Sequence, residues 1–194
     1  MDIAEFYQNV NYKYETTPTL TTQSALSDLN ELNYQSSVGN VLVFTNDAEK
    51  EKTIFYNPET DKEILKFDSE DEVDYTSVEI FYHNFLLIFE RTEKDDKVTY
   101  SVGLYDTNGT EIATKKLSSY PEEIDASKYV SVSYDLFQFD GKIYRVSDAG
   151  AAAVIIDNPF FGSFPSNLLK TTSYYYEQKS NSIVVYDHSL NQVF

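Results

Sequence analysis

A short hairpin unit recurs along this chain, and it constrains the fold more than any other feature of the sequence. In each copy a hydrophobic strand ends in an aromatic residue, a polar turn follows, and an apolar residue stands seven or eight positions after the aromatic one. The copies are Tyr56–Ile64, Tyr105–Ile112 and Tyr186–Val193. A hairpin that repeats at intervals of tens of residues is typical of modular β architectures.

Strand-length apolar runs dominate the sequence from Val41 onward. They fall into four groups, which span Val41–Phe67, Val78–Ala113, Leu136–Ile156 and Ser173–Phe194. The Asn108-Gly109 pair between two apolar runs is the strongest local hairpin signal, because both residue types tolerate a positive φ. The sequence therefore predicts an all-β domain of antiparallel hairpins over residues 41–194.

Residues 1–40 are polar and weakly patterned, and we expect them to form a short helical or irregular N-terminal arm. Leu26, Leu29 and Leu32 lie at a spacing that places them on one face of a helix over Ser24–Leu32. A loop that packs three leucines and an arm that docks on a neighbour are equal alternatives here.

The four units, at a spacing of roughly 40–50 residues, resemble divergent β-propeller repeats, that is, WD40-like blades without the WD motif. The resemblance depends on Tyr56, Tyr105 and Tyr186, each of which closes a third strand before a turn into a fourth. It implies a partial or complete propeller. The sequence stops at Phe194 as the fourth unit's last strand begins, so we expect another chain or a missing segment to complete the structure. A β-sandwich of short strands with regular turns is the alternative fold.

The charge is one-sided, with 15 basic and 32 acidic residues and a formal net charge of -17. Phosphate binding needs clusters of Lys or Arg, so direct nucleic-acid binding is disfavoured, and so is an anionic membrane surface. No apolar run approaches the length of a spanning helix, and the N-terminus lacks the pattern of a secretory signal. We therefore expect a soluble protein, cytoplasmic or otherwise intracellular, with a virion as a further possibility.

No set of catalytic or metal-binding residues emerges from the sequence. The absence of Cys excludes thiolate chemistry, and the glycines form no phosphate-binding motif. We interpret His83 and His188 as separate histidines solvated by water, and the acidic run Asp68–Asp74 as a solvated loop rather than a Ca²⁺ site. We expect no catalytic residues, no cofactor and no bound metal, and hence not an enzyme.

Two segments are candidates for partner binding. Phe160, Phe161 and Phe164 surround a glycine between two prolines, which predicts either a loop tucked under the sheet or a hydrophobic anchor for a partner. Val193 and Phe194 lie at the expected open edge with no charge to discourage strand pairing, so we expect another chain to cover them.

These features favour a non-catalytic scaffold or protein-interaction module within a larger assembly, whose partners are other protein subunits with a basic surface. Two alternatives belong to other classes. One is a virus-encoded acidic protein, either a virion component or an inhibitor that mimics nucleic-acid charge. The other is a ligand-binding or hydrolytic β-sandwich that uses Asp68–Asp74 or the histidines.

Overall fold

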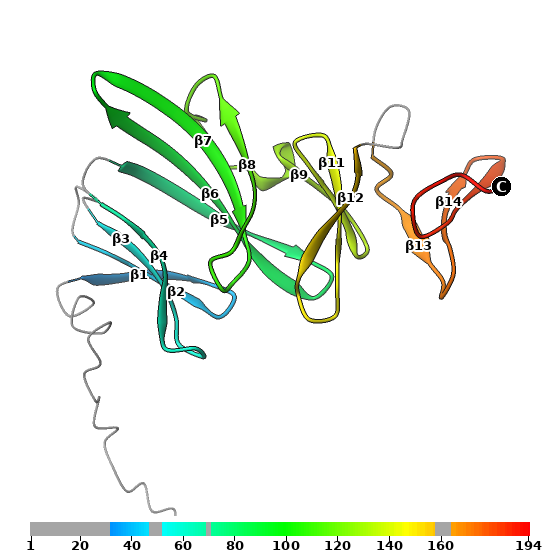
Figure 1. The fold of residues 1–194 in the computed structure, drawn as a ribbon, viewed down its shortest axis with the longest axis horizontal. Coiled ribbons are helices and arrows are strands. Elements are labelled where there is room, and N and C mark those ends of the chain that lie inside the picture. The colour runs from blue at the N-terminus through cyan, green and yellow to red at the C-terminus, as the bar shows by residue number, and fades with distance from the viewer. Residues whose placement is uncertain (1–31, 47–51, 69–70, 158–163) are drawn as a thin grey trace, which may run out of the picture.

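The protein is built almost wholly of antiparallel β-strands, which confirms the predicted fold class (Figure 1). The structure, a computed structural model, describes residues 32–46, 52–68, 71–157 and 164–194. Within these ranges the strands form four sheets, and in each sheet the strands follow one another in sequence order. Such up-and-down sheets need only short hairpin connections.

Fifteen strands make up these four sheets, numbered here from first to fourth along the chain. The first two sheets contain β1 (Asn33–Val38), β2 (Val41–Thr45), β3 (Thr53–Asn57), β4 (Lys62–Phe67), then β5 (Asp71–Ile80), β6 (His83–Lys94), β7 (Lys97–Tyr105) and β8 (Glu111–Leu117). After the 3₁₀ turn η2 (Ala126–Lys128), the last two contain β9 (Val130–Ser133), β10 (Leu136–Phe139), β11 (Lys142–Val146), β12 (Ala152–Asp157), then β13 (Leu168–Lys170), β14 (Tyr175–Lys179) and β15 (Ser182–Tyr186).

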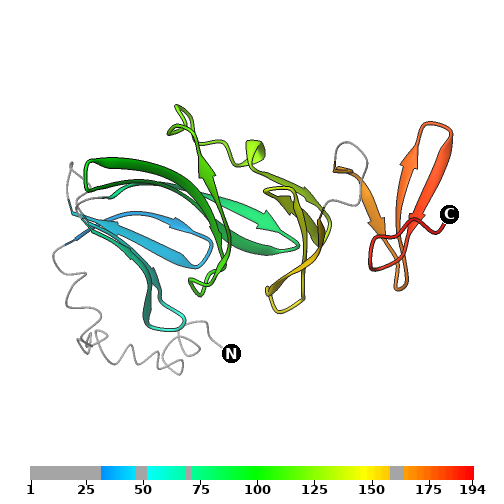
Figure 2. The same ribbon diagram turned by 45° about the horizontal axis from the view of Figure 1, so that its top comes forward.

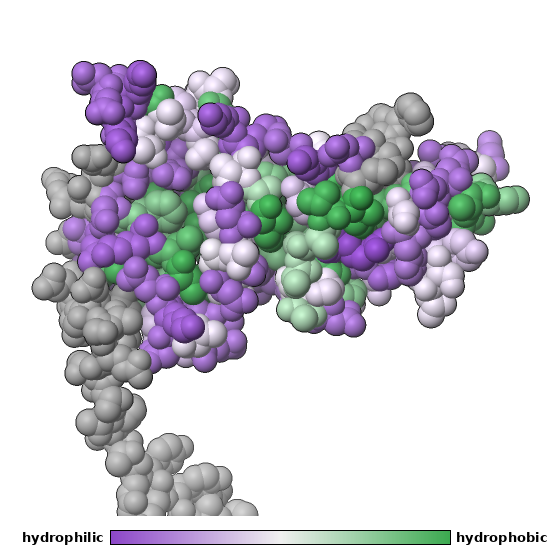
Figure 3. Space-filling model, in the orientation of Figure 1, coloured by the Kyte–Doolittle hydropathy of each residue, from purple (hydrophilic) through white to green (hydrophobic). Residues whose placement is uncertain are grey.

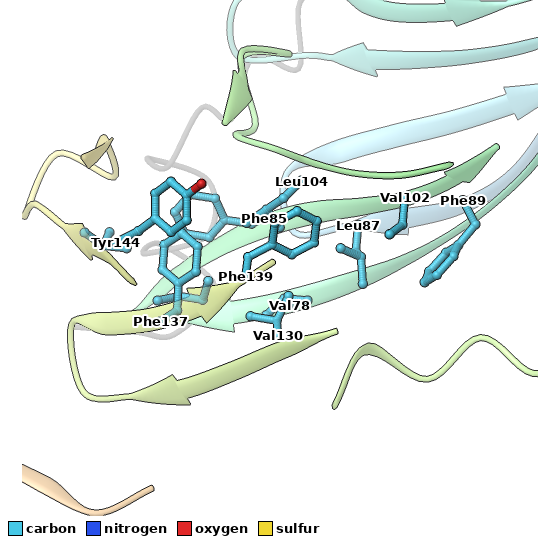
Figure 4. Close-up of a cluster of buried hydrophobic side chains, with 12 residues drawn as sticks. Val78, Phe85, Leu87, Phe89, Val102, Leu104, Val130, Phe137, Phe139 and Tyr144 are labelled. Atoms are coloured by element: carbon cyan, nitrogen blue, oxygen red, sulfur yellow. The ribbon is translucent and has the colours of Figure 1, made fainter. Parts of the chain in front are cut away.

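The four sheets stand in a row and pack face to face, as the two ribbon views show (Figures 1 and 2). Three apolar clusters fill the spaces between neighbouring sheets. The largest joins the second sheet to the third; there Phe85 packs near Phe137, and the rings of Phe137 and Tyr144 stack 4.9 Å apart (Figure 4). This serial stacking is compatible with a propeller-like or a sandwich arrangement.

The recurring hairpin unit corresponds to the turn between the third and fourth strands of a sheet. In the second sheet Asp106 N donates to Thr110 O at 3.0 Å, and in the fourth Asp187 N donates to Asn191 O at 2.9 Å. The Asp carboxylate also accepts two backbone N–H groups inside its own turn in both cases. The third sheet has the same backbone turn, in which Ser147 N donates to Ala151 O at 2.9 Å. Local side-chain capping thus explains why the polar residues recur.

Two turn glycines differ in whether they allow neighbouring sheets to approach closely. Gly109, in the β7–β8 turn, has φ 80°, and a Cβ there would lie 2.5 Å from the backbone oxygen of Ile64 on β4. Gly141, in the β10–β11 turn, has φ 78° but faces open space. The first glycine is therefore required for sheet packing, whereas the second only shapes its hairpin.

The two-residue turn between β5 and β6 consists of Phe81 and Tyr82, with φ 50° and 64°. A turn with two positive φ values favours Asn-Gly or Asp-Gly, as in the Asp140-Gly141 turn of the third sheet. Bulky side chains in this backbone region cost on the order of 1–3 kcal/mol each. The turn is therefore strained.

The structure corrects the sequence prediction at two places. The all-β region begins before residue 41, because Asn33–Val38 pairs with β2 as the edge strand of the first sheet. Asp71–Asp74 belongs to β5 rather than to a solvated loop, because β5 pairs with β6 along its whole length and buries Val73. The predicted helix over residues 24–32 lies almost wholly outside the described residues.

In the described part of the chain, no helix has the length and apolar character needed to cross a membrane.

The contact between the first two sheets can be tested with two matched glycine substitutions. We expect Gly141→Ala to lower the free energy of unfolding by about 1–2 kcal/mol, the cost of a left-handed non-glycine residue. Gly109→Ala should cost on the order of 1–3 kcal/mol more, because its Cβ meets backbone that cannot move aside cheaply. Urea unfolding of both variants measures the difference, and equal losses would contradict the proposed close approach.

Tyr56 and Tyr105, at or next to the ends of β3 and β7, lead us to expect that the free energy of unfolding falls at alkaline pH. The hydrogen bond from Tyr56 to Asp61, together with burial, raises the pKa of Tyr56 to about 12. Burial and the nearby charges of Glu111 and Glu90 raise the pKa of Tyr105 to about 12. Unfolded tyrosine titrates near pH 10, so the folded state holds more protons between about pH 10 and 12.

The stabilisation from both tyrosines is therefore complete below about pH 10 and declines as the pH rises toward 12. We expect the double variant Tyr56→Phe, Tyr105→Phe to lose less stability over this range than the parent protein. Urea unfolding at a series of pH values measures both slopes. If the free energy of unfolding falls equally with pH in the parent and in the double variant, these two hydroxyls do not titrate as described.

Candidate protein-binding surface

The fourth sheet has one buried face and one face that no other sheet covers within the described residues. Leu168, Tyr175 and Tyr186 point toward the third sheet and belong to the apolar cluster there. Side chains alternate along a strand, and directly paired residues share a face. The opposite face therefore carries the row of paired residues Leu169, Tyr176 and Val185, with Gln178 and Ile183 beside them.

We call these five residues the outer face: Leu169, Tyr176, Gln178, Ile183 and Val185. It holds no charged side chain, and Leu169 and Ile183 are 50% and 56% exposed. Hydrophobic surface is visible at this end of the molecule near the C-terminus, whereas much of the visible surface over the first two sheets is hydrophilic (Figure 3). An uncharged sheet face of this kind is suited to contact with another protein.

A hollow of about 600 Å³ borders the outer face. It lies between the fourth sheet and the β9–β10 turn, and its lining includes Tyr134, Leu169 and Gln178. The outer face is therefore not flat, and a side chain of a partner has a place to insert beside it.

A buried polar cluster fixes the fourth sheet on the third. Asp135, in the β9–β10 turn, is 1% exposed, and its carboxylate accepts a hydrogen bond from the hydroxyl of Tyr175 at 3.0 Å. The same carboxylate is in contact with the ammonium group of Lys170. Arg145 on β11 donates through Nε to the Tyr175 hydroxyl at 3.0 Å and also donates to the carbonyl oxygen of His188. Four segments distant in sequence are thereby joined around one carboxylate.

The electrostatics of this cluster support a structural role. Burial raises the pKa of Tyr175, and the charge of Asp135 raises it further, so the hydroxyl stays protonated and donates. Burial opposes the charge on Lys170, but the hydrogen bond and the charge of Asp135 prevail and raise its pKa. The carboxylate is thus held between a cation and a phenol, and neither Asp135 nor Tyr175 lines the hollow beside the outer face.

The two histidines lie at different contacts between sheets. The sequence prediction that His83 and His188 are not brought together is therefore confirmed. His83 Nε2 lies 3.0 Å from the carbonyl oxygen of Asp148. His188 was expected to be solvated by water, but its ring packs on Tyr175 at 5.6 Å and its Nε2 atom is buried. The described residues contain no group of three or more side chains suited to hold a metal ion.

The predicted partner-binding residues have three different outcomes. Val193 and Phe194 are 52% and 82% exposed, and their backbone hydrogen bonds with Val185 add a short fourth segment to the fourth sheet. Phe164 is 8% exposed and packs in the apolar cluster between the third and fourth sheets, which agrees with the alternative of a tucked loop and contradicts an exposed anchor at this residue. Phe160 and Phe161 lie outside the described residues.

Sequence reasoning missed Leu169 and Ile183, which form the most exposed part of the outer face. Ile183 lies in the run Ser182–Tyr186, where several consecutive apolar residues hide the alternation that separates the two faces. Leu169 lies in a strand of only three residues, too short for a periodic pattern.

No protein-family model matches the chain, and no curated protein matches it.

The role of the buried carboxylate can be tested with a pair of neutralising substitutions. We expect Asp135→Asn to lower the free energy of unfolding by about 3 kcal/mol, because it removes the buried negative charge that pairs with Lys170 and replaces one of the two acceptor oxygens with an NH2 donor. Glu123→Gln is the control, since Glu123 pairs with Lys128 at 3.8 Å on an exposed surface. It should cost less than about 1 kcal/mol. Equal losses in urea unfolding would show that the cluster does not hold the two sheets together.

Proposed function

We propose that the protein is a non-catalytic, β-propeller-like interaction module that presents the outer face of its fourth sheet to a partner protein. The observation that supports this best is the contrast between the sheet faces. Apolar clusters fill the contacts from the first sheet to the fourth, whereas the outer face has the same apolar character and remains exposed.

The occupant that fits the outer face is an apolar β-sheet face from another protein. In the described part of the chain an apolar cluster lies between each pair of neighbouring sheets, so such a partner continues the existing mode of packing. Val193 and Phe194 lie at one edge of the same sheet and extend the apolar surface. A partner sheet that packs on the outer face would bury Leu169 and Ile183. The fourth sheet buries Leu136 and Ile143 of the third sheet in the same way.

The charge of the chain favours a partner with a basic rim around that apolar face. At a formal net charge of -17, a second copy of the same chain is repelled over the whole approach. A partner with a basic surface is attracted instead, and the attraction weakens as salt screens it. We therefore expect association with such a partner to slow as the salt concentration rises.

The propeller-like part of the proposal is supported by the order of the sheets. Three four-stranded meanders and a three-stranded one, each packed on the next, follow the sequence order of propeller blades. The second, third and fourth sheets also share the same kind of turn after their third strand. A partner sheet on the outer face then takes the place of the next blade.

A charge placed on the outer face tests this proposal. We expect Ile183→Lys and Leu169→Lys to reduce co-purification of the native partner at least tenfold, because each buries an unpaired ammonium group on binding. Both side chains are half exposed, so the midpoint of urea unfolding should change little.

The matched control is Val98→Lys on β7, where the valine is 38% exposed and lies in a different sheet. It should leave the partner bound. A photo-crosslinking residue at position 183 should label one partner protein. Sedimentation of the protein without that partner should show a monomer. Self-association through position 183, or full partner binding by both outer-face variants, would contradict the proposal.

A further inference from the structure

A second surface lies apart from the outer face, along one side of the row of sheets, where hairpin turns of the first three sheets meet. It surrounds a hollow of about 320 Å³. The turns that bound it come from the first three sheets and include Asn40, Glu59, Tyr82, Asp106 and Gly150. Its volume is in the range of about 300–1,000 Å³ that is usual for sites that bind small groups.

Tyr82 lines this hollow with a largely exposed side chain, and the fold gains little from it. The residue is 83% exposed and has a left-handed backbone, with φ 64°. Its neighbour Phe81 is partly buried and packs on Tyr134, with ring centroids 5.2 Å apart, so Phe81 holds the turn in place. Strain at a residue that contributes little packing is typical of positions kept for binding.

The hollow is lined by two carboxylates and by no Lys or Arg. Glu59 accepts one neutral hydrogen bond, from Asn40 Nδ2 at 2.9 Å. Asp106 accepts backbone N–H groups from Asn108 and Thr110, at 2.9 and 2.8 Å. Among the described residues no Lys or Arg pairs with either carboxylate, so these neutral donors leave both negative charges without a cation from that part of the chain. An exposed aromatic ring beside uncompensated carboxylates is complementary to a cation.

The same chain already places cations on aromatic rings nearby. Lys170 Nζ lies 5.9 Å from the ring centroid of Tyr134, and the Arg145 guanidinium lies 5.5 Å from that of Tyr175. Among the described residues Tyr82 has no such cation from its own chain. In the aromatic group formed by Phe81, Tyr82 and Tyr134, the Tyr134 ring therefore has a cation from its own chain, and the Tyr82 ring has none among the described residues.

We infer that the hollow beside Tyr82 binds the arginine side chain of a partner protein segment. The planar guanidinium stacks on the Tyr82 ring, and its N–H groups reach Glu59 and Asp106 across the hollow. Arginine fits better than lysine because one planar group supplies both the stacking face and several donors. This site uses the turns of the first three sheets and does not depend on the outer face of the fourth.

The direct test is an NMR titration with a capped tripeptide, glycine-arginine-glycine, and with the same peptide carrying citrulline. Citrulline keeps the shape of arginine but has no charge. We expect the arginine peptide to give saturable shifts at the backbone amides around Tyr82, Asn40 and Asp106. The citrulline peptide should give none. Equal shifts with both peptides, or no saturable shifts with arginine, would overturn the inference.

A substitution that leaves the net charge unchanged separates this site from general attraction to an acidic protein. Tyr82→Asn should weaken binding of the arginine peptide about two- to fivefold, the range of an exposed cation–π contact. Thermal stability should stay the same or rise, because asparagine accepts the left-handed backbone. Tyr174→Asn, at a tyrosine 47% exposed on the fourth sheet, is the control and should bind as the parent does.

Glu59→Gln should also weaken binding of the arginine peptide, and Glu122→Gln, outside the hollow, should change it less. Unchanged binding by Tyr82→Asn, or equal weakening by Tyr82→Asn and Tyr174→Asn, would show that the acidic surface attracts the peptide without a site at Tyr82.

Discussion

The stack of sheets depends on β6, which is buried on both faces. Phe85, Leu87 and Phe89 point toward the third sheet, while Leu86 and Ile88 point toward the first. Because side chains alternate along a strand, five consecutive apolar residues supply two separate cores. A shift of one residue in the pairing of β6 exchanges the two sets and disrupts both contacts at once. The register of this strand therefore fixes three sheets together.

The sequence predicted the hairpin unit well because its information is local. Asp106 and Asp187 cap their own turns through backbone N–H groups within four residues, and this chemistry recurs as a visible motif. Strand β1 was missed for the opposite reason. Its residues Tyr34, Ser36 and Ser37 are polar or exposed, so pairing with β2, rather than any periodic pattern, makes this segment a strand.

The candidate surface was predicted only in part, because it combines a local signal with distant ones. Val193 and Phe194 were found because an uncharged strand edge is visible in the sequence. Phe164 has the same apolar character but is buried, and only the packing of the third and fourth sheets decides which apolar residues are covered. Asp135 and Tyr175 are forty residues apart, so no spacing rule brings them together.

The fourth sheet is held on the third by two different forces, and this difference bears on how a partner is selected. The apolar cluster supplies attraction without direction, whereas the Asp135 carboxylate requires Lys170 and Tyr175 at defined positions. The outer face offers only the first of these forces, since it holds no charge. Discrimination between partners must then come from charges around it, and the net charge of -17 already acts against a second copy of the chain. We therefore propose that an apolar face on a strongly acidic chain selects a basic partner through repulsion of the alternatives.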